Sequence, residues 1–347
     1  MSSDKRIAVA MSGGVDSSVA CARLINDGWE VTGVFFVFTD HNLNDKEDVS
    51  NVAGELGIPI HTVDLRQKFN NIVVSTFVSS YRSGITPNPC VCCNGQLKFP
   101  ALAQFANDIG AQWIATGHYA RIGKDVKTNR YYVQVPRDSS RDQSYFLYQL
   151  TQEILSRLVL PLGDATKNDV RRLAREYGLK VSEKPDSQDV CFLEHGRYVD
   201  FLKAHGGIGE PGPVVGTHGN VIGEHDGLAM YTIGQRHGIR LSRGKPLYVV
   251  GIDKNKNTLI VGDVSELEVS SFRVGGFERM ALAEGQQEFR ALVKIRSRSK
   301  TVDCMVKRTN GETCSVCLDY PEYAVTPGQS AVFYDGDKVL GGGIIAL

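Results

Sequence analysis

The residues with the clearest chemical potential stand near the start of the chain, in the run S-G-G-V-D-S-S at 12–18. The apolar run Ile7–Met11 before it predicts a buried strand, and the residues after it predict a helix through Ile25. Gly13 and Gly14 allow a tight turn and a close approach of the backbone to an anion. Because backbone N–H groups at a helix start attract phosphate, this run predicts a phosphate-binding loop.

The loop follows neither of two well-known phosphate-loop patterns. No Gly-Lys-Ser/Thr follows it, which excludes a Walker A loop, and its glycines do not match G-x-G-x-x-G. Ser12, Ser17 and Ser18 add hydroxyl donors. Asp16 is out of place beside a phosphate unless it binds Mg²⁺ or orients the loop. The plain alternative is a glycine turn with a serine cap.

A second group of reactive residues is formed by cysteines. Three of the eight, Cys90, Cys92 and Cys93, crowd the segment G-I-T-P-N-P-C-V-C-C-N-G at 84–95. Its Pro, Asn and Gly content predicts a loop. Thiols stay reduced in the cytosol, so this crowding indicates metal binding or sulfur chemistry rather than a disulfide framework.

Sulfur insertion needs two cysteines in one site. One thiolate carries a persulfide sulfur and a second releases it by exchange, which leaves a disulfide. Cys93 and Cys191, which are distant in sequence, fit this demand. The metal alternative is a zinc site that pairs the 90–93 cysteines with Cys314 and Cys317.

A basic segment is the one local candidate for nucleic-acid binding. Lys plus Arg and Asp plus Glu both number 39, so the net charge of zero gives no general attraction to nucleic acid. In K-I-R-S-R-S-K, however, Lys294, Arg296, Arg298 and Lys300 alternate with other residues. On a strand they would share one face, about 6.6 Å apart at roughly 3.3 Å per residue. The alternative is a solvated strand face.

The elements that must position these residues fall into two regions. Strands at 31–38, 60–63 and 113–116 alternate with helices at 45–56, 69–83 and 99–109, which predicts a parallel sheet covered by helices. Thr166 and Asp169 predict a capped helix over 166–177. From about residue 206 onward, dense glycine and short alternating runs predict β structure, ending in a small barrel.

Composition limits the class of protein. The chain has 347 residues, 42% hydrophobic and 22% charged, which is typical of a globular protein with two or three domains. No apolar run approaches the roughly 20 residues that span a bilayer. The polar segment Met1–Arg6 leads straight into a strand, so no signal peptide is predicted and a cytoplasmic location is expected, without a membrane partner.

The phosphate loop resembles that of the ATP-pyrophosphatase superfamily, which cleaves ATP to AMP and pyrophosphate. That resemblance implies an α/β fold of the adenine-nucleotide hydrolase-like type. It also implies an adenine-side contact at Phe36, at the end of the second strand. Gly117 and His118, in A-T-G-H-Y-A-R, match the second nucleotide-binding loop of the superfamily; the alternative for His118 is a buried, hydrogen-bonded histidine.

The whole chain resembles the tRNA-specific 2-thiouridylase family. The matching segments are A-M-S-G-G-V-D-S-S, G-I-T-P-N-P-C-V-C-C-N, A-T-G-H-Y-A-R, R-D-Q-S-Y-F-L, K-P-D-S-Q-D-V-C-F, Y-T-I-G-Q-R and A-V-T-P-G-Q-S-A-V-F-Y. The resemblance implies an ATP-binding catalytic domain at 1–204, a small central β-rich domain at 205–268 and a tRNA-binding C-terminal β-barrel at 269–347.

The resemblance also implies a set of site residues. Cys93 is the nucleophile and Cys191 the persulfide carrier. ATP is expected at Ala10, Met11, Ser12, Gly13, Gly14, Val15, Asp16, Ser17, Phe36 and Gly117. Contacts with tRNA are expected at Asn88, Pro89, Cys90, His118, Arg141, Asp142, Gln143, Arg296, Ser297 and Gln329.

The function that follows is ATP-dependent 2-thiolation of the wobble uridine of tRNA. ATP with Mg²⁺ adenylates the C2 oxygen, and sulfur from a donor protein or from sulfide replaces it. The expected partner is the anticodon arm, whose single-stranded loop lets the uridine leave its stack at low cost. The alternatives are another ligase or amidotransferase of the superfamily, or a non-catalytic nucleotide-binding or iron–sulfur module.

Cys90 departs from the family pattern, in which many members carry an Asp thought to act as an acid or base. Two roles are open to it. Cys90, Cys93 and Cys191 could hold a [4Fe–4S] cluster whose open iron carries sulfide, or Cys90 could be a spectator beside a Cys93–Cys191 persulfide pair. Two smaller departures are Ser297, which replaces the Tyr of an Arg-Tyr pair, and Pro100.

Overall fold

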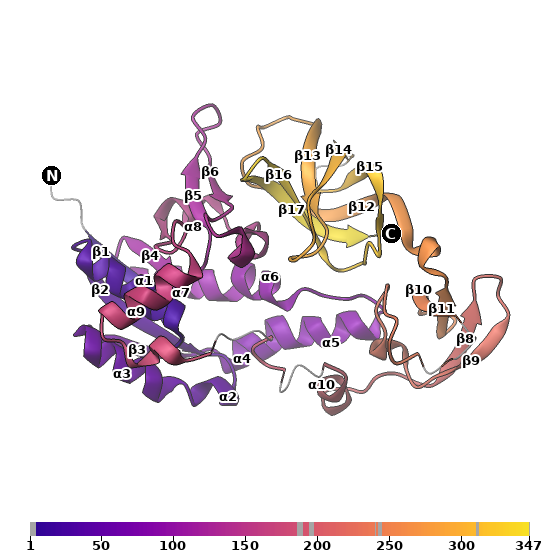
Figure 1. The fold of residues 1–347 in the computed structure, drawn as a ribbon, viewed down its shortest axis with the longest axis horizontal. Helices are drawn as coiled ribbons and strands as arrows, with labels where there is room; N and C mark the ends of the chain where they lie inside the picture. Colours follow the sequence, from indigo (N-terminus) through magenta and orange to yellow (C-terminus); the bar gives the residue numbers. More distant parts are fainter. Residues whose placement is uncertain are drawn as a thin grey trace.

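The computed structural model describes residues 5–185, 190–193, 198–239, 241, 245–309 and 312–346. Within these ranges the chain forms three sheets: a parallel sheet with helices, a small mixed sheet and a C-terminal barrel (Figure 1). None of the described helices is long and apolar enough to cross a membrane.

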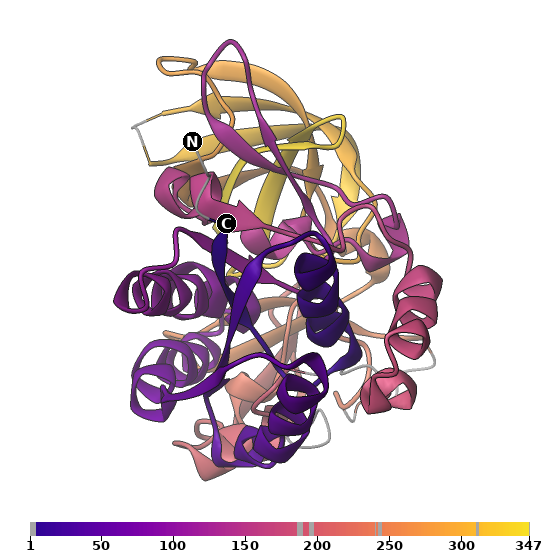
Figure 2. The ribbon, with the colours of Figure 1, turned by 90° about the vertical axis from the view of Figure 1, so that its left-hand side faces the viewer.

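The first sheet is parallel and has the strand order β3-β2-β1-β4-β7. Its strands are β1 (Arg6–Ala10), β2 (Glu30–Val37), β3 (Ile60–Asp64), β4 (Trp113–Thr116) and β7 (Leu158–Val159). Side chains alternate between the two faces, so Ile7 and Val9 pack in one core while Ala8 packs in the other. Figure 2 shows the strands running between two groups of helices. The predicted α/β class is confirmed.

Ten α-helices lie in the N-terminal part of the described chain. They are α1 (Val15–Asn26), α2 (Asp40–Leu43), α3 (Lys46–Leu56), α4 (Arg66–Phe69), α5 (Ser75–Arg82), α6 (Pro89–Cys93), α7 (Phe99–Asp108), α8 (Gln152–Arg157), α9 (Lys167–Glu176) and α10 (Tyr198–Ala204). The helix predicted at 166–177 is present as α9. Thr166 Oγ1 accepts from the Asp169 N–H at 3.1 Å, and the Asp169 carboxylate accepts from the Thr166 N–H at 3.0 Å.

Two sequence-based assignments in the N-terminal part of the chain were wrong. The single helix predicted over 69–83 is interrupted by a π-helical segment, Asn70–Val74. The segment 84–95 was predicted as a loop, but Pro89–Cys93 forms α6 and continues through a second π-helical segment, Asn94–Lys98, into α7. Asn88 explains the error, because its side chain caps α6 and the following proline suits the first helical position.

The remaining chain is built of strands. The central sheet has the order β10-β11-β8-β9. Its strands are β8 (Gly212–Gly216), β9 (Val221–His225), β10 (Tyr248–Asp253) and β11 (Thr258–Gly262). The barrel strands are β12 (Glu268–Arg279), β13 (Glu288–Lys294), β14 (Val302–Arg308), β15 (Cys314–Tyr323), β16 (Ser330–Asp335) and β17 (Lys338–Ala346). Pairing of β12 with β17 closes the predicted barrel.

A hairpin from the N-terminal part extends the barrel sheet. Its strands are β5 (Arg121–Lys124) and β6 (Tyr131–Gln134), and β6 pairs with β17. The Arg121 guanidinium also reaches Asp337 at 2.9 Å. The hairpin therefore joins the barrel to the first sheet, a link that the sequence analysis did not predict.

The basic segment at 294–300 is not the strand that its alternation predicted. Strand β13 ends at Lys294, and the next residues form a turn in which the Ser299 N–H donates to Arg296 O at 3.1 Å. Arg296, Arg298 and Lys300 are exposed on this turn. Lys294 differs from them, because its ammonium is largely buried against Asp142.

Candidate active site

The glycine loop connects the end of β1 to α1, as predicted. Ala10, Met11, Ser12, Gly13, Gly14, Val15, Asp16 and Ser17 follow one another through this connection. The hydroxyl of Ser17 accepts from the Ser12 N–H at 3.1 Å and lies 3.2 Å from Gly14 O, which fixes the turn. Gly14 is the N-cap of α1 and has no side chain to satisfy the first N–H groups. These groups can therefore bind an anion.

Asp16 has two partners that the sequence analysis missed. The Tyr119 hydroxyl donates to Asp16 Oδ1 at 2.7 Å, and Lys167 Nζ lies 2.7 Å from the same oxygen. Lys167 is only 7% exposed and is the first residue of α9, directly after the capping Thr166. The structure thus places an ammonium beside a phosphate-type loop that has no lysine of its own. The only sequence feature near Lys167 was the capping box. This box predicts where α9 begins, but it does not predict that Lys167 contacts Asp16.

Gly117 lies directly against the first turn of α1. A Cβ atom there would stand 2.7 Å from Ser17 N and 2.8 Å from the carbonyl carbon of Asp16, closer than real Cβ contacts. Only glycine fits this approach. The loop after β4 that carries Gly117 is therefore packed on the phosphate loop.

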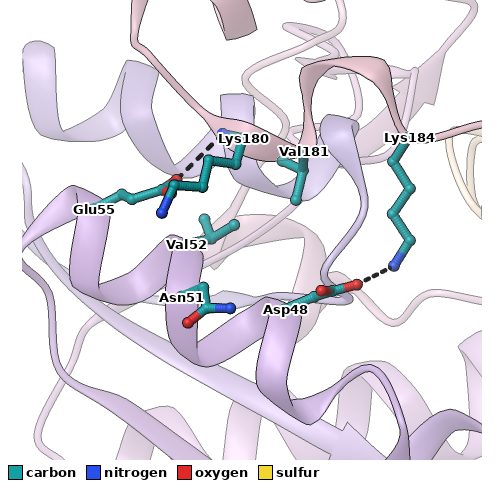
Figure 3. A pocket seen from close by; sticks show the side chains of 7 residues that line it. All are labelled: Asp48, Asn51, Val52, Glu55, Lys180, Val181 and Lys184. Atoms are coloured by element: carbon teal, nitrogen blue, oxygen red, sulfur yellow. Dashed lines mark hydrogen bonds and ion pairs between the residues drawn. The ribbon is translucent and has the colours of Figure 1, made fainter.

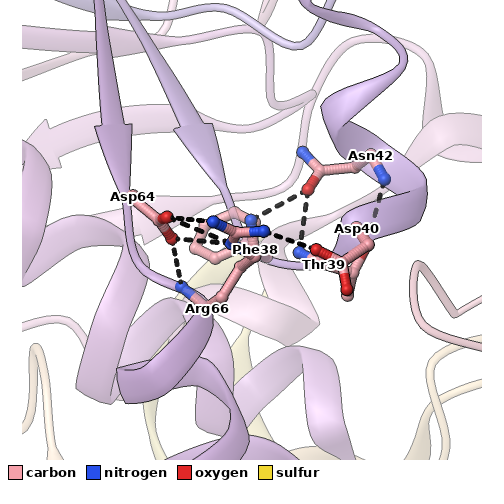
Figure 4. Close-up of polar contacts among 6 residues, drawn as sticks. All are labelled: Phe38, Thr39, Asp40, Asn42, Asp64 and Arg66. Atoms are coloured by element: carbon pink, nitrogen blue, oxygen red, sulfur yellow. Dashed lines mark hydrogen bonds and ion pairs between the residues drawn. The ribbon is translucent and has the colours of Figure 1, made fainter.

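The end of β2 is held by a network of polar contacts (Figure 4). The Asn42 amide donates to Phe36 O at 3.0 Å, and its carbonyl accepts from the N–H groups of Phe38 and Thr39 at 2.8 and 2.9 Å. Nearby, Arg66 forms ion pairs with Asp64 and Asp40. Asn42 therefore fixes the backbone that follows Phe36, where the adenine-side contact is predicted.

Helix α6 presents the cysteines of the 84–95 segment. Asn88 Oδ1 accepts from the Val91 N–H at 3.3 Å, and Pro89 begins the helix. Residues three apart share a helix face, so Cys90 and Cys93 lie on the same side. Cys92 differs from both, because its thiol lies 3.8 Å from Ile72 O.

Cys191 lies within electrostatic range of Cys93. Cys93 is 8% exposed, whereas Cys191 is exposed. The loss of surrounding water, followed by the charge of Cys93, raises the pKa of Cys191 to about 12 although part of the residue reaches solvent. Cys90 acts on the same group more weakly. Two residues 98 positions apart are thus close enough for the charge of Cys93 to affect Cys191.

Lys98 is the positive charge of this group, and the sequence analysis did not assign it a role. Burial raises the pKa of the Cys93 thiol, and Lys98 opposes this effect both through its charge and through a backbone hydrogen bond. Lys98 also acts on Cys90 and Cys191. It closes the π-helical turn that begins after Cys93. π-Helical turns are frequent at functional sites. This turn is visible in the structure and was not predicted from the sequence.

The barrel contacts the segment just before α6. Gln329 Nε2 donates to Thr86 O and Pro87 O, both at 3.1 Å, and the Thr86 N–H donates to Pro327 O at 3.0 Å. A Cβ on Gly328 would stand 2.7 Å from Thr86 O. The predicted tRNA residue Gln329 therefore lies beside the stretch that leads to Asn88 and Pro89.

A second group of predicted tRNA residues joins β4, the 138–147 turn and the barrel. Asp142 Oδ2 lies 2.5 Å from Lys294 Nζ, and both side chains are largely buried. Gln143 Oε1 accepts from the Tyr119 N–H at 2.7 Å. Both groups thus have partners within the chain. Arg141 is exposed.

His118 is half-buried. Its Nδ1 is 2.7 Å from Thr116 Oγ1, and its ring packs against Phe99 with centroids 5.6 Å apart. Burial, with a smaller effect of Lys98, lowers the pKa of His118 to about 3. The imidazole is therefore neutral at physiological pH.

The proposed zinc alternative receives no support. Cys314 and Cys317 lie on β15 of the barrel, and Cys314 is buried in its core. Among the described residues, no group of three or more His, Cys, Asp or Glu is arranged to hold a metal ion. The same finding applies to Cys90, Cys93 and Cys191, which are not arranged as a metal site in the described part of the chain.

Together, the sheet, its glycine loop and the barrel define an α/β nucleotide-hydrolase-like protein with two appended β domains. Family models match in the same order: a tRNA methyl transferase HUP domain at 5–195, a tRNA methyl transferase PRC-barrel domain at 199–263 and an aminomethyltransferase beta-barrel domain at 269–345. A tRNA-specific 2-thiouridylase MnmA from Pelobacter propionicus is 44% identical, over 98% of this chain and 97% of that protein. Another from Halothermothrix orenii is 40% identical, over 98% of both chains. The chain belongs to the tRNA-specific 2-thiouridylase family.

Solved structures resemble the fold only distantly. The U34-tRNA thiolase NcsA from Methanococcus maripaludis, solved with its [4Fe-4S] cluster, has 18% identity and a TM-score of 0.34. The match covers 58% of this chain and 67% of that chain. At this level, the ligands of that protein are no guide to the ligands of this one.

Proposed function

We propose that this chain activates the C2 oxygen of the wobble uridine of tRNA with ATP and replaces that oxygen with sulfur. The single observation that carries the proposal is the presence, in one N-terminal unit, of an uncapped phosphate-type loop and of two cysteines distant in sequence, of which Cys93 raises the pKa of Cys191. Family relatives named tRNA-specific 2-thiouridylase support the same assignment. The proposed division into domains at 1–204, 205–268 and 269–347 assigns the loop and both cysteines to the first.

The first half of the reaction would take place at the glycine loop. The N–H groups of α1 and the Lys167 ammonium would bind the triphosphate, and Asn42 would hold the backbone that contacts adenine. Mg²⁺, with Asp16 as the nearest carboxylate ligand, would offset phosphate charge. The uridine O2 would attack the α-phosphorus and expel pyrophosphate, which leaves the C2 oxygen bonded to AMP. This oxygen can then depart with AMP.

The second half would use the cysteine pair. A persulfide on Cys191 would attack C2 through its terminal sulfur and displace AMP. The Cys93 thiolate would then attack Cys191 Sγ, so that a Cys93–Cys191 disulfide forms and the transferred sulfur keeps the electron pair of the broken S–S bond. A thiol reductant must reduce the disulfide before the next turnover. A persulfide-bearing protein then reloads Cys191 by transferring its outer sulfur to the thiolate, whereas sulfide can reload it only by attacking the disulfide itself at Cys191 Sγ, which releases the Cys93 thiolate.

The tRNA would lie across α6 and the adjoining face of the barrel. Asn88, Pro89 and Cys90 would meet the target base, and Gln329 lies beside the segment that leads to them. Arg141, Arg296 and Ser297 would contact the anticodon arm from the exposed surface. For Asp142 and Gln143, the internal bonds favour a supporting role in which they hold Lys294 and Tyr119.

The test is a thiolation assay with anaerobically purified protein, unmodified tRNA, ATP, Mg²⁺ and either sulfide or a persulfide donor. We expect 2-thiouridine at position 34, pyrophosphate in equal amount, and no product when position 34 is cytidine. Cys93→Ser and Cys191→Ser should lose thiolation, whereas Cys317→Ala, an exposed barrel cysteine, should keep it. If both serine variants stay active, a ligase or amidotransferase activity replaces this proposal. If tRNA causes no pyrophosphate release, a non-catalytic module replaces it.

A [4Fe–4S] cluster at Cys90, Cys93 and Cys191 is the second chemistry that the residue types allow. The shared helix face of Cys90 and Cys93 favours it, whereas the described arrangement is not that of a ready metal site. Iron and sulfide analysis of anaerobic protein decides between the two. About four irons, lost in Cys90→Ala, would establish the cluster. Colourless protein that thiolates from a persulfide donor, with Cys90→Ala active, would exclude it.

A further inference from the structure

The turn at 138–143 has an exposed tip and bonded ends. The tip is the short 3-10 helix Ser139–Arg141, and all of its residues are exposed, including the predicted tRNA residue Arg141. Just before the tip, Asp138 Oδ2 accepts from the Lys167 N–H at 3.0 Å. The first end of the turn therefore holds the backbone at the start of α9, from which the Lys167 ammonium reaches the phosphate loop.

The last end of the turn holds Tyr119. Gln143 Oε1 accepts from the Tyr119 N–H at 2.7 Å, and the Gln143 N–H donates to Tyr119 O at 3.0 Å. These two bonds pair the backbone of Tyr119 with a single residue of the turn, and Tyr119 is only 3% exposed. Tyr119 therefore has its backbone on the turn and its hydroxyl on Asp16 of the phosphate loop.

Both ends of the turn thus lead to one oxygen atom. Asp16 Oδ1 lies 2.7 Å from the Tyr119 hydroxyl and 2.7 Å from Lys167 Nζ. The turn, the two donors and the start of α1 form a closed ring in which every link is a hydrogen bond, an ion pair or the backbone itself. Asp16 is the carboxylate that the proposed function places nearest to Mg²⁺ and the triphosphate. A shift of the turn therefore moves both donors of a group that ATP would meet.

We propose that the turn at 138–143 couples tRNA binding to ATP binding, with Asp138 and Tyr119 as its positioning residues. The inference rests on the proposed function and deepens it. A tRNA bound at the exposed tip orders the turn, the turn fixes Tyr119 and Lys167, and these two residues hold Asp16 for the nucleotide. Such a coupling is reciprocal, so tRNA tightens ATP binding by the factor by which ATP tightens tRNA binding, typically about 5- to 150-fold.

Helix α3 supports the same loop at a different residue and so provides a control. A Cβ atom on Gly13 would stand 3.2 Å from Asp48 Cβ, which places α3 directly against the loop. Asp48 and Lys184 both line a pocket beside α3 (Figure 3), and Lys184 Nζ lies 2.7 Å from Asp48 Oδ2. Because this support reaches the loop at Gly13, a change at Lys184 separates a general loss of loop support from a loss of the contacts at Asp16.

The experiment measures binding alone, with unmodified tRNA and with α,β-methylene ATP, which cannot release pyrophosphate. The dissociation constant of the analogue is measured with and without saturating tRNA, and that of tRNA with and without the analogue. The variants are Tyr119→Phe, Asp138→Ala and the chain with both changes, and the melting temperature of each is recorded. Tyr198→Phe is the matched control, because the Tyr198 hydroxyl donates to Met230 O at the same 2.7 Å on another part of the chain. Lys184→Met is the control for loop support.

In the unmodified chain, tRNA should tighten binding of the analogue at least about fivefold, and the analogue should tighten tRNA binding equally. Tyr119→Phe and Asp138→Ala should each reduce this coupling factor to less than about half, and the double variant should bring it close to one. Both controls should keep the normal factor. A purely structural role would lower the melting temperature and both affinities but leave the factor unchanged.

The inference is overturned if the coupling factor is one in the unmodified chain, if Tyr119→Phe and Asp138→Ala both keep the normal factor, or if either control lowers it as much as they do. A failure of the proposed function has a different signature. A chain that couples tRNA to the analogue but forms no 2-thiouridine would refute the proposed function and keep the inference. A chain that forms 2-thiouridine while its two substrates bind independently would refute the inference alone.

Discussion

Replacement of Lys167 by methionine should weaken the use of ATP much more than it weakens the fold. The ammonium lies 2.7 Å from Asp16 Oδ1 at the start of α1, where a bound triphosphate would place its charge. A hydrogen bond to a charged group contributes about 1.5–3 kcal/mol. At about 1.4 kcal/mol per factor of ten, kcat/KM for ATP should fall roughly 10- to 150-fold.

The cost to stability should be smaller. Asp16 keeps the Tyr119 hydroxyl at 2.7 Å when Lys167 is lost, and its side chain is 35% exposed. The 3–5 kcal/mol expected for breaking a fully buried pair therefore reduces to about 1 kcal/mol. Methionine keeps the aliphatic volume beside the Tyr119 ring.

The assay is tRNA-dependent pyrophosphate release at saturating tRNA and varied ATP, with melting temperature recorded in parallel. Lys167→Arg should recover part of kcat/KM because it keeps the charge. Lys338→Met is the matched control, since Lys338 forms a comparable ion pair with Asp125 far from the loop. The reasoning is refuted if Lys167→Met keeps kcat/KM for ATP within about threefold, because Lys167 would then only neutralise Asp16.

Three further outcomes follow from the same geometry. Gly117→Ala should abolish pyrophosphate release while the chain still folds, because its Cβ would meet the α1 backbone at 2.7 Å; normal ATP turnover in this variant would contradict the close packing. Arg296→Ala and Arg298→Ala should each reduce the slope of log K for tRNA binding against log salt concentration by about 0.7–0.9 per lost phosphate contact. The slope is measured by titration at several salt concentrations. Unchanged slopes would mean that both residues are solvated turn residues without phosphate contacts. Lys98→Met should shift the alkylation of Cys93 by iodoacetamide to higher pH, because the positive charge that lowers the pKa of this thiol is gone; an unchanged pH profile would remove Lys98 from the site.

The sequence predicted the fold correctly where a structural feature depends only on residues that are close together in the chain. The Thr166–Asp169 capping box lies within a single turn, so the helix start could be read directly. The alternation of buried residues in β1 likewise reflects the two faces of one strand. The prediction failed at α6, because Asn88 and Pro89 occur both in loops and at helix starts, and packing of the following π-helical turn decides between them.

Contacts between distant residues could not be predicted in this way. Lys167 meets Asp16 across 151 positions, and nothing in either local pattern specifies the partner. The same holds for Asp142 and Lys294, where alternation suggested a basic strand face but the ion pair buries the first lysine of the series. An alternating charge pattern indicates a surface that could be exposed. Which of its charges forms an ion pair with a distant residue depends on the folded structure.

The family resemblance implies an Asp in many members at the position of Cys90, and a cysteine there has different electrostatics. Burial raises the pKa of Cys90, so at neutral pH it is a protonated thiol and cannot take the place of a carboxylate as a base. An Asp at this position would add a negative charge beside Cys93 and oppose formation of its thiolate. In this chain burial raises the pKa of Cys93, Lys98 lowers it, and Cys90 raises it by less than Lys98 lowers it. The same loss of charge would favour a soft metal ligand, so the iron content of the protein, rather than the position of Cys90, distinguishes the two chemistries.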